Sequence, residues 1–257
     1  MSTESTPPLV RIQRWLPYWA VLQADVRQTL RSWVYRTWMI LSILAAVGYL
    51  FYRLGAYRIA GLVQPASSLV TDLLQWTLVG SVTLIIALTV GSIASERGTL
   101  ACSILSRGIS RYQYFLGKWH ARLFTVLLSF LLMSVLWLLA SYFLLHEDLT
   151  LLGILWAMLT TLALLMAIIS CGVTVSAMSN STLLGLAIAW LALYALSFVS
   201  SLAPTQFPSP EKLIQRIPYV LQGKFDSAYL LRFVLGSVVL SCAMAFVGMS
   251  YFARRDV

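Results

Sequence analysis

The chain has 257 residues, of which 60% are hydrophobic and 11% are charged, and its mean hydropathy is +0.83. A typical soluble domain is about half apolar and about a quarter charged, so this composition excludes a water-soluble globular protein. The formal net charge of +9 would suit a nucleic-acid-binding protein, but the basic residues lie between apolar stretches and form no single basic face. This placement is typical of a membrane protein and argues against nucleic acid as a partner.

Residues 1–32 are expected to form a cytoplasmic tail and a helix that does not cross the membrane. Apolar residues recur there at spacings of three and four, at Trp15, Trp19, Leu22, Val26, Leu30 and Trp33. The polar residues on the other sides are Gln23, Asp25, Arg27, Gln28 and Arg31. This pattern predicts an amphipathic helix in the membrane interface, with tryptophan at the depth of the lipid headgroups and arginine toward water. The alternative is a soluble helix that packs on a partner.

Residues 33–257 contain six long apolar stretches. A helix needs about 20 apolar residues to cross a hydrocarbon core of about 30 Å, and it satisfies its own backbone hydrogen bonds in lipid. We therefore expect an all-α, polytopic membrane domain with spans at 33–52, 73–94, 121–145, 149–178, 182–202 and 231–252. If the amino terminus is cytoplasmic, most of the 18 lysine and arginine residues lie inside. The positive-inside rule thus predicts that both termini are cytoplasmic.

The external connection, residues 203–230, is longer than a simple hairpin loop. Ser209 suits the N-cap position of a helix, Pro210 suits the first helical position, and the residues that follow have an apolar face. We expect a short amphipathic helix over 209–217 on the outer surface, where it would act as a lid over an exit. An ordinary loop is the alternative.

The cytoplasmic connection, residues 95–120, carries helix-ending and helix-starting signals in succession. Gly98 suits the C-terminus of the second span, because glycine enters the left-handed conformation at little cost. Thr99 can cap a new short helix and Gly108 can end it. A helix over 99–107 would be a rod of about 13 Å at a rise of 1.5 Å per residue. A cytoplasmic partner can push such a rod as a unit.

The residues that follow predict another helix and complete a family pattern. Ser110 and Gln113 form a capping box, so a helix should begin there and run toward the next span. The whole segment reads Glu96, Gly98, Thr99 and Leu100, then 105–111, then Gly117 and Lys118. In these residues the chain resembles the type-2 ABC transporter permeases, particularly the branch that contains permeases of copper-enzyme maturation. The family's patterns are E-x-G-T-hydrophobic, L-S-x-P-I-S-R and G-K. Gly108 departs from them, because proline is usual there, and residues 25–32 and 252–256 also resemble that branch.

The resemblance implies that residues 95–120 hold a coupling helix, which docks on a separate ATPase subunit and relays ATP-driven closure to the spans. The implied partner-binding residues are Glu96, Arg97, Gly98, Thr99, Leu100, Ser103, Ile104, Leu105, Arg107 and Gly108. It further implies two ATPase subunits that bind ATP and Mg, a second copy of the permease or a paralogue, and membrane lipid as partners. The expected location is the bacterial cytoplasmic (inner) membrane, and the expected direction of transport is export.

The residue inventory limits the other functions. The chain has no G-x-x-x-x-G-K-[ST] phosphate loop, so ATP would have to bind elsewhere. The predicted spans hold no ionisable residue away from their ends, which disfavours transport coupled to protons or sodium. The adjacent carboxylates Glu147 and Asp148 have poor geometry for acid and base roles, and we find no metal-ligand spacing or activated nucleophile. We therefore expect no catalytic or metal site and no cofactor in this chain. The expected function is an ATP-driven permease subunit for an unidentified substrate. The alternative is a structural or assembly subunit of a membrane complex that does not transport.

Overall fold

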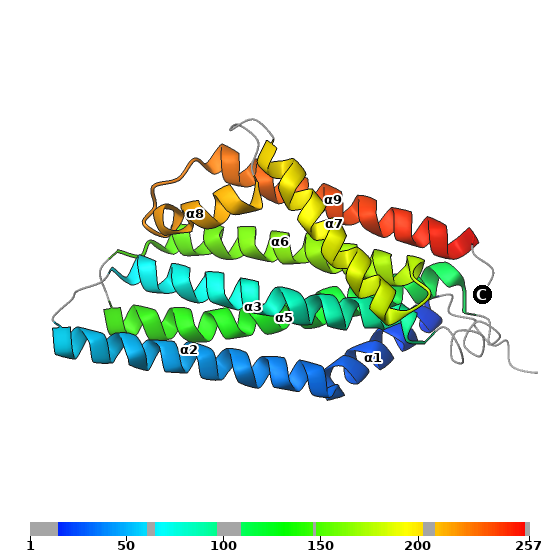
Figure 1. The fold of residues 1–257 in the computed structure, drawn as a ribbon, viewed down its shortest axis with the longest axis horizontal. Coiled ribbons are helices and arrows are strands. Elements are labelled where there is room, and N and C mark those ends of the chain that lie inside the picture. The colour runs from blue at the N-terminus through cyan, green and yellow to red at the C-terminus, as the bar shows by residue number, and fades with distance from the viewer. Residues whose placement is uncertain (1–14, 61–64, 97–108, 146–147, 203–208, 255–257) are drawn as a thin grey trace, which may run out of the picture.

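The computed structural model describes residues 15–60, 65–96, 109–145, 148–202 and 209–254 (Figure 1). Over these residues the regular secondary structure is entirely helical. The helices are α1 (Leu16–Arg31), α2 (Trp33–Ala60), α3 (Ala66–Ala94), α5 (Arg111–Leu145), α6 (Leu151–Met178), α7 (Thr182–Leu202), α8 (Pro210–Leu221) and α9 (Ser227–Arg254). The expected all-α fold is thereby confirmed.

Six of these helices, α2, α3, α5, α6, α7 and α9, are long and apolar enough to cross a membrane. The chain therefore has the architecture of a multi-pass membrane protein. Several helices are longer than their predicted spans: α2 continues past 52 to Ala60, and α3 begins at Ala66 instead of 73. An apolar stretch locates the part of a helix that suits lipid, whereas the helix itself continues until a cap or proline ends it.

The predicted helix at Ser110 and the third predicted span are one continuous helix of 35 residues, α5. The capping box is present: the Gln113 amide donates to Ser110 Oγ over 3.2 Å, and the Ser110 amide donates to Gln113 Oε1 over 3.2 Å. At 1.5 Å per residue α5 is about 52 Å long, well beyond a hydrocarbon core of about 30 Å. Its first turns can therefore lie outside the lipid core.

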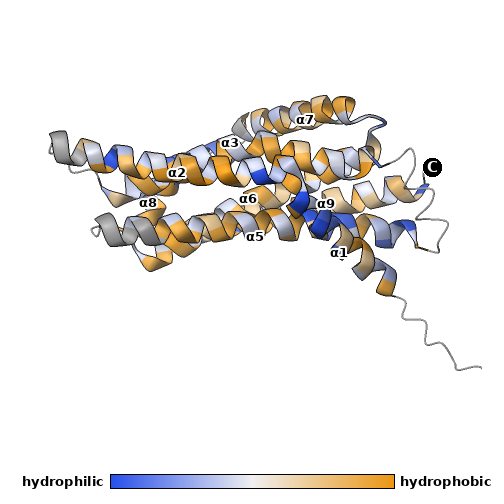
Figure 2. Cartoon of the chain, turned by 90° about the horizontal axis from the view of Figure 1, so that it is seen from below, coloured by the Kyte–Doolittle hydropathy of each residue, from blue (hydrophilic) through white to orange (hydrophobic). Residues whose placement is uncertain are grey.

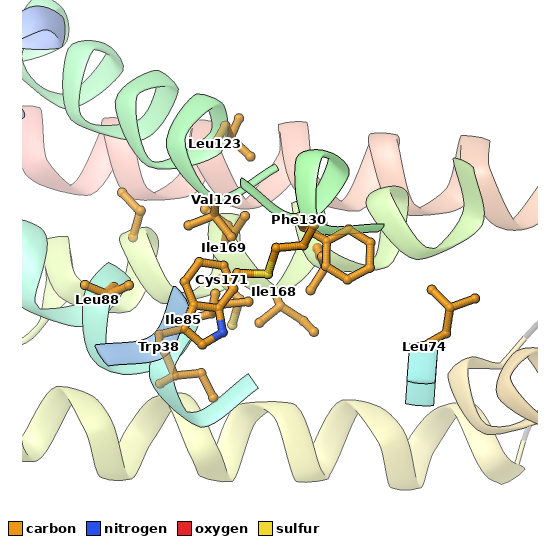
Figure 3. Close-up of a cluster of buried hydrophobic side chains, with 14 of the residues drawn as sticks. Trp38, Leu74, Ile85, Leu88, Leu123, Val126, Phe130, Ile168, Ile169 and Cys171 are labelled. Carbon is orange, nitrogen blue, oxygen red and sulfur yellow. The ribbon is translucent and has the colours of Figure 1, made fainter. Parts of the chain in front are cut away.

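The spanning helices lie side by side, and α1 sits at the end of the bundle where α9 ends (Figure 1). Small residues bring α6 close to its neighbours. A side chain at Gly172 would clash with Thr89 of α3, and a side chain at Gly248 of α9 would meet Thr174 and Phe115. The apolar core between these helices contains Trp38, Ile85, Phe130 and Ile169, among others (Figure 3).

The predicted short helix in residues 203–230 is confirmed as α8. The Ser209 side chain caps it by accepting a hydrogen bond from the Lys212 amide, and the helix continues past 217 to Leu221. It packs on α6, where the Thr150 amide donates to the Leu221 carbonyl over 2.9 Å. A side chain at Gly153 would clash with the Val220 carbonyl, so glycine permits this close approach.

The predicted amphipathic helix is also present, as α1, but one of its residues faces a different way than expected. Asp25 does not share the solvent-facing side with Arg27 and Arg31; it is 2% exposed and points into the protein. Its neighbours one turn away on the same face, Val21 and Thr29, are buried as well. This face packs on α5, where a side chain at Gly117 would come within 2.9 Å of Val21.

Candidate functional site

The predicted coupling segment is bounded by two positions that the structure does describe. The predicted helix is neither confirmed nor contradicted, because nine of the predicted partner-binding residues lie outside the described residues. They are Arg97, Gly98, Thr99, Leu100, Ser103, Ile104, Leu105, Arg107 and Gly108. Glu96 immediately precedes them, in the turn after α3, and Ile109 immediately follows them, two residues before α5 begins at Arg111. The site can therefore be built from the two ends to which the segment is attached.

Lys118 of α5 joins these ends to α1. Its Nζ lies 2.6 Å from Glu96 Oε1 and 2.8 Å from Asp25 Oδ1. Tyr114, one turn earlier on α5, donates its hydroxyl proton to Glu96 Oε2 over 2.6 Å. One ammonium group thus connects three helical elements that lie far apart in the sequence.

Arg122 completes the arrangement one turn further along α5. Its Nη1 donates to Thr29 Oγ1 over 2.7 Å, and its Nε lies 3.2 Å from Asp25 Oδ2. Thr29 in turn donates to the backbone carbonyl of Asp25 over 2.7 Å. We call Asp25, Glu96, Lys118 and Arg122 the charge cluster. Figure 2 shows the corresponding hydrophilic patch where α1 meets the bundle.

The spacing of these residues explains how the cluster forms. Tyr114, Lys118 and Arg122 are four residues apart, so they lie on one face of α5. Asp25 and Thr29 are likewise four apart on the face of α1 that packs against α5. The helical repeat therefore stacks donors on one helix opposite acceptors on the other.

The charge cluster is buried and electrically balanced. Asp25, Glu96, Lys118 and Arg122 are 2%, 8%, 3% and 6% exposed, respectively, and two carboxylates face two cations. Such a buried group adds little net stability when it is intact, because desolvation offsets the attraction, but it strongly penalises the loss of one member. The cluster therefore fixes how α1, the end of α3 and α5 sit against one another.

A second connection holds the last turn of α3 from the other side. Ser176 of α6 accepts hydrogen bonds from the Ile93 and Ala94 amides, each over 3.0 Å, and donates to the Val90 carbonyl. The same hydroxyl thus contacts the Ala94 amide and the Val90 carbonyl, four residues apart on α3. The turn that leads to Glu96 is thus attached to α6 as well as to its own helix.

The structure separates the predicted interfacial residues into two groups. Trp15 and Trp19 are 62% and 63% exposed, and Arg27 and Arg31 are exposed as well, as an interfacial helix requires. Asp25 instead belongs to the charge cluster. Glu96, predicted to contact a partner at the membrane end of the coupling segment, is directed inward to Lys118 and Tyr114.

Several residues of the site were missed at the level of sequence, namely Thr29, Tyr114, Arg122 and Ser176, while Lys118 was noted only as part of a motif. A signal was present in α5, where Tyr114, Lys118 and Arg122 repeat at a helical spacing ahead of an apolar stretch. Their partners were not readable, because Asp25 is 93 residues from Lys118 along the chain. Only the packing of α1 on α5 brings them together.

No protein-family model and no curated protein matches the chain. The function must therefore be inferred from the residues and geometry of the site.

Proposed function

We propose that the chain is the membrane-spanning permease subunit of an ATP-driven ABC transporter, most consistent with an exporter, in which residues 97–108 dock on a separate ATPase subunit. The observation that supports this proposal is the charge cluster. It joins both flanks of this segment, the end of α3 and the start of α5, to the interfacial helix α1. A segment that receives force from a partner needs flanks that move together.

The contacts offer a route from that segment to the bundle. A push on residues 97–108 acts on Glu96 and on the first turns of α5, which Lys118 and Tyr114 link directly. Through Asp25 the same push reaches α1, and through Ser176 it reaches α6. Since α6 packs against α3, α5, α7, α8 and α9, motion at this end would be distributed over the domain.

The distribution of charge favours an external energy source. Among the described residues, the buried charged side chains all belong to the charge cluster, at one end of the bundle. Carriers driven by ions usually place ionisable residues at mid-membrane, where they bind and release the coupling ion. The polar residues deeper in α3 and α6 are hydroxyls such as Thr89 and Thr161, which donate to carbonyls of their own helices.

The remaining elements of the proposal follow from this assignment. We place the protein in the bacterial cytoplasmic membrane with the charge cluster and both termini on the cytoplasmic side, as the distribution of lysine and arginine favours. Two copies, or one copy and a paralogue, would pair with two ATPase subunits that bind ATP and Mg. Lipid would surround α1 at the interface, with Trp15 and Trp19 among the headgroups.

The association with an ATPase is directly measurable. A tagged full-length chain, purified in mild detergent from the membranes of its native host, is expected to retain a subunit that carries a G-x-x-x-x-G-K-[ST] phosphate loop. The two proteins should be present in equal amounts by quantitative mass spectrometry. A complex with other membrane proteins but without an ATPase would instead support the structural or assembly role.

A further inference from the structure

Two contacts between side chains join helices α2 and α3, and the two helices stand apart in the stretch between these contacts. At one level Trp38 Nε1 of α2 donates to Ser81 Oγ of α3 over 2.8 Å. At the other, Arg53 and Asp72 form an ion pair across the two helices. Trp38 and Arg53 are 15 residues apart, which corresponds to about 22 Å along a helix.

Between the two bridges lies a groove of about 280 Å³. It exists because small side chains face one another there, among them Ser42 and Ala45 of α2 and Gly80 of α3. Gly80 has open space where a side chain would begin, and Trp76, which is 72% exposed, stands beside it. The groove is therefore a feature of the helix surfaces and is open on one side.

The location of the groove decides what kind of molecule can fill it. It lies within the apolar stretches of two helices, and most of α2 in this region is exposed on the surface of the chain. At this depth the surroundings are hydrocarbon, so an apolar groove is filled by acyl chain and not by water. Its lining residues run along α2 from Trp38 to Tyr49 and along α3 from Leu73 to Leu84, the course that an extended acyl chain would take.

One end of the groove carries a pair of opposite charges. Tyr49 lines the groove and donates its hydroxyl proton to Asp72, while Arg53 Nε donates to the same hydroxyl oxygen over 2.8 Å. The Arg53 and Asp72 side chains are 18% and 37% exposed. The bonds that Asp72 accepts from Tyr49 and Arg53 both end on Oδ2, so Oδ1 is engaged by neither residue.

We propose that this groove is a binding site for a phospholipid with a zwitterionic headgroup, phosphatidylethanolamine in chemical class. The acyl chain lies between α2 and α3, the phosphate faces Arg53, and the ammonium group faces Asp72. A cation and an anion side by side match the two charges of such a headgroup, whereas an anionic headgroup would leave Asp72 opposed by a like charge or by none. This site does not depend on the transport function or on the ATPase.

The test uses the full-length chain in lipid nanodiscs that contain phosphatidylethanolamine with a photoreactive diazirine on its acyl chain. After illumination, mass spectrometry should find the label concentrated on the residues that line the groove. Gly80→Leu fills the groove and should remove most of that label. Gly236→Leu is the matched control, because Gly236 of α9 also has open space at its Cβ position, and this variant should label like the wild type.

The headgroup is tested with the same diazirine chain on phosphatidylglycerol. We expect it to label the groove about fivefold less, the effect of roughly one favourable charge contact at a membrane surface. Asp72→Asn should abolish the preference, because Asp72 faces the ammonium group that phosphatidylglycerol lacks, whereas Asp226→Asn, at an exposed aspartate just before α9, should preserve it. Equal labelling by the two lipids would overturn the headgroup assignment. Label spread evenly over the exposed helices would overturn the site itself.

Discussion

Replacing Lys118 with methionine is expected to destabilise the folded chain by about 3–5 kcal/mol, the usual cost of removing one partner from a buried ion pair. Glu96 would then lose the cation that it contacts, and Arg122 alone would remain beside Asp25, in a place where both carboxylates are at most 8% exposed. The attachment of α1 to α5 should weaken first, because the Lys118 contact to Asp25 spans these two helices. The free energy of unfolding, measured by steric trapping in nanodiscs, checks this expectation.

Two further variants separate the charge effect from the loss of packing. Lys118→Met combined with Glu96→Gln restores a balanced cluster of Asp25 and Arg122, so it should recover a large part of the lost stability. Arg27→Met removes an exposed arginine from α1 and should change the free energy of unfolding by no more than about 0.5 kcal/mol. If Lys118→Met is as stable as Arg27→Met, the charge cluster does not hold these helices together.

The double variant Leu100→Asp with Ile104→Asp is expected to weaken the binding of the ATPase about a hundredfold. Each apolar side chain, buried in a groove of the partner, contributes roughly 1–2 kcal/mol, and about 3 kcal/mol together corresponds to this factor. The spans should still fold, because both residues lie in the predicted coupling segment between α3 and α5. Co-purification of the ATPase from membranes with equal amounts of each variant measures the loss.

A matched variant tests whether apolar contact or charge is responsible. Cys102→Asp with Ser106→Asp adds the same two negative charges at the same spacing, on the opposite face of the predicted helix. It should retain most of the ATPase. If both double variants lose the ATPase equally, the segment acts through its positive charge alone; if neither does, it is not the docking site.

The elements that could be predicted from sequence are those with local causes. Six apolar stretches located six helices, the serine and proline at 209 and 210 located α8, and the capping box at 110–113 located the start of α5. Each signal depends on residues within one or two turns of one another. Helix α2 extends beyond the end of its predicted span and α3 begins before its predicted span, because hydropathy reports the suitability of a residue for lipid and not the end of a helix.

The charge cluster and the groove between α2 and α3 could not be predicted, since both arise from contacts between different segments of the chain. Asp25 is the only acidic residue in α1, and its charge suggested a place in water, although on a helical wheel it lies well away from Arg27 and Arg31 and shares a face with Val21 and Thr29. Its partners become evident only when α1 packs on α5. The groove likewise depends on small residues of two helices facing each other, and a single helix gives no sign of which glycines lie opposite which alanines.

The proposed docking of residues 97–108 on an ATPase subunit requires direct contact between the two proteins. It is tested most directly by placing the photoreactive residue benzoylphenylalanine at position 104 of the full-length chain and illuminating native membranes. The same probe at Leu132, which is 54% exposed within α5, serves as the control. We predict one dominant adduct from position 104, joining the chain to a protein with an ATP-binding phosphate loop, and no such adduct from position 132. Adducts from position 104 only with lipid, or with a protein that lacks that loop, would contradict the account.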